Sequence, residues 1–177
     1  PRNLPACACE VVAVHGGAFP ARAEILATLP GIGRSTAAAI AAICFGERAA
    51  ILDGNVKRVL TRVLGFAADL SGAAAQRALW DRAEALLPRR ATGDSMPRYT
   101  QGLMDLGATV CLSRNPACLL CPVNDLCVAQ REGAAESYPV KTRKVRRSAQ
   151  SLWLLQAQSR DGAGWLEKRP ATGTPAG

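Results

Sequence analysis

Apolar residues recur three and four positions apart through most of this 177-residue chain, which is the spacing that places them on one face of an α-helix. Stretches with this spacing are bounded by glycine, proline or serine, residues that commonly start or end helices. They lie at 6–15, 20–29, 34–46, 55–65, 71–88 and 96–111. No convincing alternation of apolar and polar residues occurs before about residue 150. The pattern therefore predicts a mainly α fold.

The expected helices differ in how much of their surface is apolar. Residues 6–15 carry enough apolar side chains for a buried helix, and residues 34–46 are almost wholly apolar, as in a helix that is buried on most sides. Residues 55–65 are amphipathic, with valines and leucines on one face and Lys57, Arg58 and Arg62 off that face.

The pattern changes near the C-terminus. Two short apolar runs in 151–170 flank a turn rich in Asp and Gly, as in a β-hairpin. Residues 141–147 carry five Lys and Arg and no acidic residue, out of a formal net charge of +8. Such a run serves either as a solvated tether or, beside a nucleic-acid site, as a source of phosphate attraction. We expect a basic linker at 139–150 and the start of an α/β or β unit at 151–177.

Length and composition narrow the class of protein. A chain of 177 residues with 49% hydrophobic content is long enough for one core and part of a second unit. No apolar run approaches the length of a membrane span, and no secretory leader is recognisable. We therefore expect a cytoplasmic protein with reduced thiols. The first and last residues suggest a fragment.

Four of the seven cysteines fall within 111–127, at Cys111, Cys118, Cys121 and Cys127. Disulfides, a zinc site and an iron–sulfur cluster would each explain the grouping, and a reducing compartment favours a metal. Their spacing does not separate zinc from a cluster, because four thiolates suit either. The other three, Cys7, Cys9 and Cys44, lie in apolar helical surroundings and are interpreted as packing residues.

A short glycine-containing turn, "LPGIGRSTA", joins two of the expected helices. We expect Gly31 and Gly33 to adopt backbone angles that other residues resist. Exposed N–H groups at these glycines, together with the positive end of the next helix near Arg34 and Ser35, would bind an anion such as a DNA phosphate. The alternative is an ordinary connection between two helices.

These segments together resemble one family. "LPGIGRSTAAAI", "AILDGNVKRVLTR" and "CLSRNPACLLCPVNDLC" are similar to the helix-hairpin-helix DNA glycosylases with an iron–sulfur loop, and most similar to MutY-type adenine DNA glycosylases. The resemblance covers residues 2–138 and includes "RNL" and "HGGAFP". It implies a glycosylase domain at 1–138, a 4Fe–4S cluster on the four cysteines of 111–127, and a truncated Nudix-like domain at 151–177.

The resemblance also assigns roles to individual residues. Asp53 matches the carboxylate that stabilises the sugar cation, although a helix N-cap would explain an Asp there equally well. Ser35 stands where relatives that also cut the backbone carry a lysine, so hydrolysis by water is expected. Asn55 and Lys57 match positions beside the DNA, although Lys57 could simply be solvated. The expected DNA contacts are Gly31, Ile32, Gly33, Arg34, Ser35 and Lys57, and the expected catalytic residues are Asp53, Ser35 and Asn55.

The implied activity is hydrolysis of the N-glycosidic bond of adenine mispaired with 8-oxoguanine or guanine in duplex DNA, by a monomer. The family's catalytic glutamate and its DNA wedge precede "RNL", so the chain alone is expected to be inactive, and Pro5 replaces a residue that is often His in relatives. Two alternatives remain, namely an endonuclease III-like glycosylase and lyase, and a non-catalytic DNA-binding module.

Overall fold

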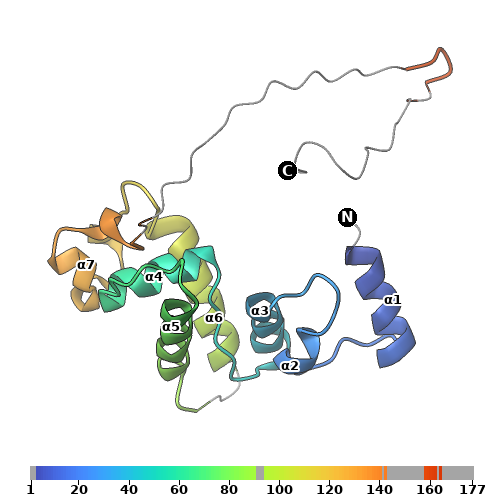
Figure 1. The fold of residues 1–177 in the computed structure, drawn as a ribbon, viewed down its shortest axis with the longest axis horizontal. Coiled ribbons are helices and arrows are strands. Elements are labelled where there is room, and N and C mark those ends of the chain that lie inside the picture. Colours follow the sequence, from blue (N-terminus) through green and yellow to red (C-terminus); the bar gives the residue numbers. More distant parts are fainter. Residues whose placement is uncertain (1–2, 91–93, 141, 143–157, 163, 165–177) are drawn as a thin grey trace. The chain divides into compact units, whose positions relative to one another are not determined.

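A computed structural model describes residues 3–90, 94–140, 142, 158–162 and 164. The chain divides into two units, Pro1–Lys144 and Val145–Gly177. The helices of the first unit are α1 (Asn3–His15), α2 (Ala23–Leu26), α3 (Arg34–Phe45), α4 (Gly54–Leu64), α5 (Ala73–Ala85), α6 (Ser95–Asp105) and α7 (Val128–Arg131) (Figure 1). None of the described helices is long and apolar enough to span a bilayer. The mainly helical prediction is confirmed.

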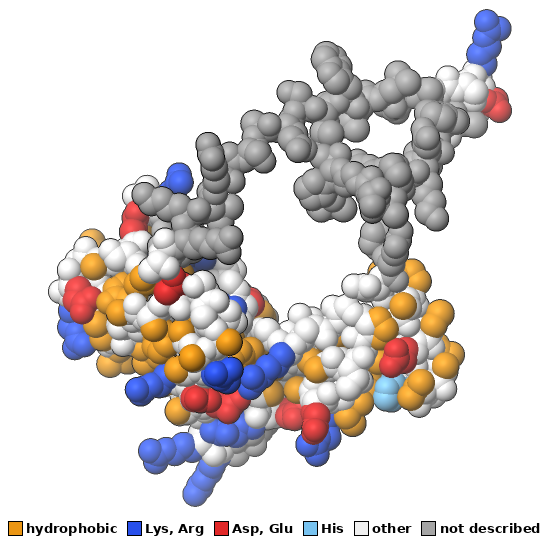
Figure 2. All heavy atoms as spheres, viewed as in Figure 1, with side chains coloured by type: hydrophobic (Ala, Val, Ile, Leu, Met, Phe, Trp, Pro, Cys, Tyr) orange, Lys and Arg blue, Asp and Glu red, His pale blue; other side chains and the backbone are white. Residues whose placement is uncertain are grey.

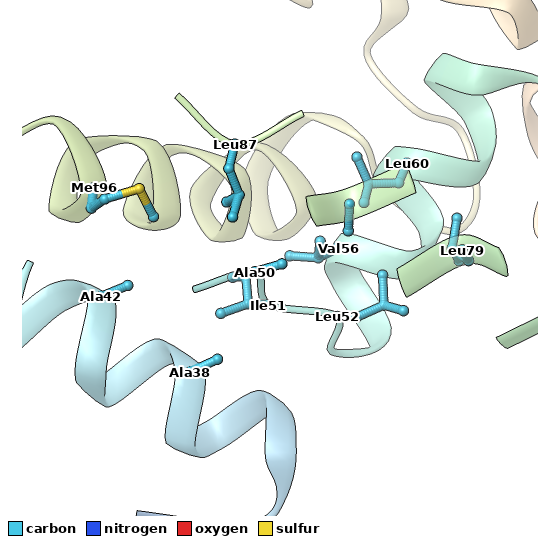
Figure 3. Packing of buried hydrophobic residues seen from close by; sticks show 11 residues of the cluster. Ala38, Ala42, Ala50, Ile51, Leu52, Val56, Leu60, Leu79, Leu87 and Met96 are labelled. Carbon is cyan, nitrogen blue, oxygen red and sulfur yellow. The ribbon is translucent and has the colours of Figure 1, made fainter. Parts of the chain in front are cut away.

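The main core lies between α3, α4, α5 and α6 (Figure 3). Small side chains on α3 allow neighbouring segments to approach closely, and larger aliphatic side chains from the other elements fill the space between them. The buried residues of this core are Ala38, Ala42, Ala50, Ile51, Leu52, Val56, Leu60, Leu79, Ala83, Leu87 and Met96. Three consecutive residues before α4, Ala50, Ile51 and Leu52, are buried in this core, so the segment that leads into α4 is held in place.

A second, smaller core joins α1, α2 with the turn that follows it, and an adjacent face of α3. It contains Cys7, Val11, Leu26, Leu29, Ala37 and Ala41. Because α3 contributes alanines to both cores, two of its faces are buried, as its composition predicted.

Helix α1 is much less buried than its apolar sequence predicted. Only Cys7 and Val11 are buried, whereas Leu4, Val12 and Val14 are 79%, 68% and 67% exposed. Apolar side chains accordingly appear on the surface of α1 in Figure 2. The expectation of a buried helix was wrong because α1 packs along one face only.

The helix expected at 20–29 is shorter than predicted. Helix α2 contains only Ala23–Leu26 and continues as turns to Leu29. Its residue Ala23 donates its backbone N–H to the Glu47 carboxylate at 2.6 Å. A carboxylate that is distant in sequence thus provides the N-terminal acceptor, because the preceding Arg22 offers none.

The helix expected at 96–111 leads directly into the cysteine-rich loop, as predicted. Helix α6 continues as a π-helix, Leu106–Val110, and ends at Cys111. A side chain at Gly107 would place its Cβ 2.8 Å from the Cβ of Asn55. Only glycine therefore allows the π-helix to lie this close to the start of α4.

The segment after the cysteine-rich loop remains attached to the first unit. Thr142 donates hydrogen bonds from its backbone N–H, at 2.9 Å, and from its hydroxyl to the Asp69 carboxylate. These hydrogen bonds, together with one from the backbone of Ser71, lower the pKa of Asp69 to about 2. The boundary between the two units, at 144/145, falls inside the predicted linker 139–150.

Little of the second unit is described. Gln158 and Gly164 form an antiparallel bridge around a turn in which Gly162 has a φ of 86°. This turn lies within the predicted hairpin. Apart from Thr142, the basic run 141–147 lies outside the described residues, as does most of the expected Nudix-like segment 151–177.

Candidate functional site

Asp53 occupies the N-cap position of α4. Its backbone is extended, with φ −77° and ψ −176°, and its Oδ1 accepts a hydrogen bond from the Val56 N–H at 2.7 Å. The side chain is half-buried. No other hydrogen bond to this carboxylate occurs among the described residues. The cap therefore uses one oxygen and fixes the direction in which the other points.

Ser35 lies next to this cap although it is distant in sequence. Its Oγ accepts a hydrogen bond from the Leu52 N–H at 2.9 Å. Because Leu52 directly precedes Asp53, this contact ties the first turn of α3 to the start of α4. The structure thus brings together two of the three predicted catalytic residues.

Asn55, the third predicted catalytic residue, is held against the π-helix. Its Oδ1 accepts a hydrogen bond from Arg58 Nη2 at 3.0 Å. Arg58 also donates to the carbonyl oxygen of Gly107 at 2.5 Å and to that of Cys111 at 2.7 Å. Arg58 therefore connects the N-terminal end of α4 to the first cysteine of the loop. Sequence reasoning placed it only off the apolar face, although its position three residues after Asn55 puts the two side chains within reach.

The glycine turn presents unpaired backbone donors at the start of α3. The N–H groups from Gly33 to Thr36 have no hydrogen-bond acceptor among the described residues, and no side chain caps the helix. Such a helix start suits an anion. Gly31 has a φ of 81°, as expected, and a Cβ there would lie 2.6 Å from the Cβ of Asn3.

Gly33 does not need to be glycine for conformational reasons, which corrects the expectation. Its φ is −82°, an angle that any residue adopts, and a Cβ there would meet no atom within 4 Å. Ile32 of the same turn is half-buried against the second core. The turn therefore depends on Gly31 for its backbone conformation, whereas the missing side chain of Gly33 leaves the backbone at the start of α3 exposed.

We expect Gly31→Ala to destabilise the fold by about 1–2 kcal/mol, because left-handed backbone costs that much for a residue with a Cβ. Duplex affinity should fall with it. Gly33→Ala, the matched control two residues away, should leave the melting temperature unchanged. Thermal denaturation and duplex titration of both variants provide the measurement. Equal melting temperatures for the two would contradict the assignment of strain to Gly31.

The Arg34 side chain points toward α5. Its guanidinium lies 3.9 Å from the centroid of the Trp80 ring, and its Nη2 is 2.9 Å from Glu84 Oε1. Both charged side chains remain largely exposed, at 61% and 53%. The geometry shows Arg34 joining α3 to α5, so any contact that it makes with DNA remains a prediction.

Lys57 lines an open groove of about 660 Å³. Arg58, Ser113 and Tyr138 line the same groove. Lys57 is only half-buried. An ammonium in this position could reach an anion that lies along the groove.

The four cysteines of the loop line one pocket, together with apolar side chains that include Val59 and Val110. Cys111 follows the π-helix, Cys118 begins a 3₁₀ turn, and Cys127 is buried at the start of α7. All four are free thiols. Burial raises the pKa of Cys118, and the neighbouring Cys111 and Cys127 raise it further. Four thiolates so close together would repel one another unless a cation lay between them.

The residues of this pocket are suited to an iron–sulfur cluster. All four cysteines of the loop line it, and four cysteine thiolates, each on a different iron, are the usual ligands of a 4Fe–4S cluster. The residues present therefore fit this group.

The remaining cysteines behave differently from the prediction. Cys7 is buried in the second core, but Cys9 and Cys44 are exposed. Interpreting all three as packing residues was correct only for Cys7, because α1 and the end of α3 each leave one face uncovered.

Arg62 was also missed, because it was expected off the apolar face of α4. It is 2% exposed, and its Nη1 donates to Cys111 Sγ at 3.3 Å. A position four residues after Arg58 places it on the same side of the helix, facing the cysteine pocket.

Comparisons with known proteins agree with these features. Residues 15–43 match the helix-hairpin-helix motif, and residues 111–127 match the iron–sulfur binding domain of endonuclease III. The second match begins at the first and ends at the last of the four clustered cysteines. The chain binds a 4Fe–4S cluster.

Several curated relatives share one name, adenine DNA glycosylase. The protein of Buchnera aphidicola (subsp. Acyrthosiphon pisum) is 35% identical over 167 residues, which are 94% of this chain and 46% of the relative. The human protein is 44% identical over 131 residues, 73% of this chain and 23% of the relative. The Mycobacterium tuberculosis protein is 40% identical over 134 residues, 75% and 42% respectively. The chain thus spans less than half the length of these relatives.

Solved structures show the same fold. A thermostable thymine-DNA glycosylase matches with a TM-score of 0.60 and 31% identity, over 74% of this chain and 58% of that one. Endonuclease III in a non-covalent DNA complex matches with a TM-score of 0.59 and 23% identity, over 75% and 58%, which supports the fold alone. With the hairpin, the cysteine loop and these relatives in agreement, the chain belongs to the helix-hairpin-helix family of DNA glycosylases, within the MutY-type adenine DNA glycosylases.

Proposed function

We propose that this chain forms part of a base-excision repair enzyme that hydrolyses the N-glycosidic bond of adenine mispaired with 8-oxoguanine or guanine. The observation that carries the proposal is the hydrogen bond from the Leu52 N–H to Ser35 Oγ, which places Ser35 beside Asp53. This contact occurs in a chain whose relatives are named adenine DNA glycosylases. The proposed substrate is duplex DNA inside the cell, bound by a monomer.

In this proposal, Asp53 stabilises the positive charge that develops on the sugar as the base leaves. The N-cap bond engages Oδ1, so the carboxylate is held in place before the substrate binds. A charge fixed in advance costs no reorganisation during the reaction. Asn55 holds Arg58 and thereby orients the start of α4.

Ser35 favours hydrolysis over strand cleavage. It has no amine to form a Schiff base with the sugar, and its hydroxyl already accepts the Leu52 N–H. The unpaired N–H groups at Gly33 and Arg34 and the Lys57 ammonium would hold the phosphates on either side of the flipped nucleotide. Cys111, Cys118, Cys121 and Cys127 are the proposed ligands of the cluster, whose chemistry here is to cross-link the loop.

The test is a single-turnover assay with the intact gene product on duplexes that contain adenine opposite 8-oxoguanine. We expect free adenine and an intact DNA strand, with no covalent adduct after borohydride treatment, because a water molecule attacks the sugar. A trapped adduct would instead support an endonuclease III-like lyase. Tight duplex binding without adenine release would support a non-catalytic DNA-binding module.

A further inference from the structure

Arg62 is a buried cation that has no acidic partner in the part of the chain that the structure describes. Its side chain is 2% exposed. The ion pairs found among the described residues join Arg22 to Glu24, Arg34 to Glu84 and Arg98 to Asp94, and all of these are exposed. A buried charge is costly unless an opposite charge compensates it. The structure must therefore supply negative charge to Arg62 from a source other than a carboxylate.

Every guanidinium nitrogen of Arg62 donates either to the cysteine-rich loop or to the chain beyond it. Nη1 donates to Cys111 Sγ at 3.3 Å and to the Leu112 carbonyl at 2.6 Å. Nη2 donates to the Ser113 carbonyl at 3.2 Å, and Nε donates to the Tyr138 carbonyl at 3.3 Å. These acceptors engage four of the five N–H groups, but neutral carbonyls do not cancel the charge. The single acceptor that can carry a full negative charge is the sulfur of Cys111.

We propose that Arg62 is the built-in counter-ion of the iron–sulfur cluster and the residue that closes the loop around it. A cluster held by four thiolates is anionic, and Arg62 lines the same pocket as the four sulfurs. One side chain holds the start of the loop at Cys111 and the chain beyond it at Tyr138. Hydrogen bonds to ligand sulfur also tune such clusters. The inference concerns the cluster alone and holds whichever base the enzyme excises.

The test compares Arg62→Met, which removes charge and donors, with Arg62→Lys, which keeps the charge but loses the planar fork of donors. Arg98→Met is the matched control, because Arg98 lies on α6 with its side chain 82% exposed. Each variant of the intact gene product is assayed for iron and sulfide per chain, iron release to a chelator, and the Fe–S(Cys) stretching bands in resonance Raman spectra.

We expect Arg62→Met to retain little iron and Arg62→Lys to release iron about tenfold faster than the wild type, the scale of a lost outer-shell contact. An Fe–S(Cys) band of Arg62→Lys should move to higher wavenumber, because a hydrogen bond to sulfur has been lost. Arg98→Met should match the wild type. Wild-type iron content, release rate and Raman bands in both Arg62 variants would overturn the proposal. If Arg62→Met fails to fold, the release rate and spectrum of Arg62→Lys decide the matter.

Discussion

Replacing Asp53 with Asn is expected to lower the rate of adenine excision by on the order of a hundredfold or more, the effect of losing one well-placed electrostatic stabiliser. The fold should survive, because Asn caps a helix about as well as Asp. Its Oδ1 can still accept the Val56 N–H. Single-turnover excision from an 8-oxoguanine mispair and a thermal melt, both on the intact gene product, separate the loss of charge from the loss of structure.

Two further variants make this test specific. Asp94→Asn is the matched control, because Asp94 is an exposed residue at the N-terminus of α6 whose side chain makes no cap bond. It should excise adenine at the wild-type rate. Asp53→Ala removes both cap and charge, so it should lose about 1 kcal/mol of stability in addition to activity. Full excision by Asp53→Asn would reduce Asp53 to a helix cap.

Local patterns predicted the fold well where one face of a helix decides its position. The amphipathic helix at 55–65 and the helix leading into the cysteines both formed, because their apolar spacing matches a single buried face. Helix α1 shows the limit of this reasoning. Its sequence is apolar on several sides, and sequence alone cannot say how many of those sides find a neighbour. The exposure of Leu4 and Val12 depends on tertiary packing.

The site was predictable where chemistry requires a motif and not where it requires tertiary contacts. The cysteine spacing and the glycine turn could be identified in the sequence because ligands and tight turns restrict residue type. Arg58 and Arg62 could not, because a basic residue on an amphipathic helix is usually solvated. Their acceptors include backbone carbonyls at positions 107 and 111–113, and carbonyls leave no trace in the sequence.

Helix α4 consequently connects Asp53 to the cysteine-rich loop. Its N-terminus carries Asp53, and its next two turns send Arg58 and Arg62 into the cysteine-rich loop. A loop that lost its cluster would release the acceptors of both arginines. The cluster is therefore expected to matter for the geometry of Asp53 as well as for the loop.

Replacing Cys118 with Ser should lower the iron content of the purified protein by about tenfold or more, since a ligand should matter at least as much as an outer-shell contact. Anaerobically purified wild-type protein should be brown, and the variant should be pale. Duplex affinity and adenine excision should fall together, because Arg58 and Arg62 would lose the ordered loop that they contact. Iron and sulfide assays, visible absorption and duplex titration of the intact gene product measure these effects.

Cys44→Ser is the matched control, since it makes the same substitution at an exposed thiol near the end of α3. It should keep full colour, iron content and affinity, so that any difference from Cys118→Ser reflects ligation and not the loss of a thiol. A colourless wild-type protein with one equivalent of zinc would contradict the cluster assignment. Full iron and sulfide in Cys118→Ser would remove Cys118 from the ligand set and require another donor from the loop.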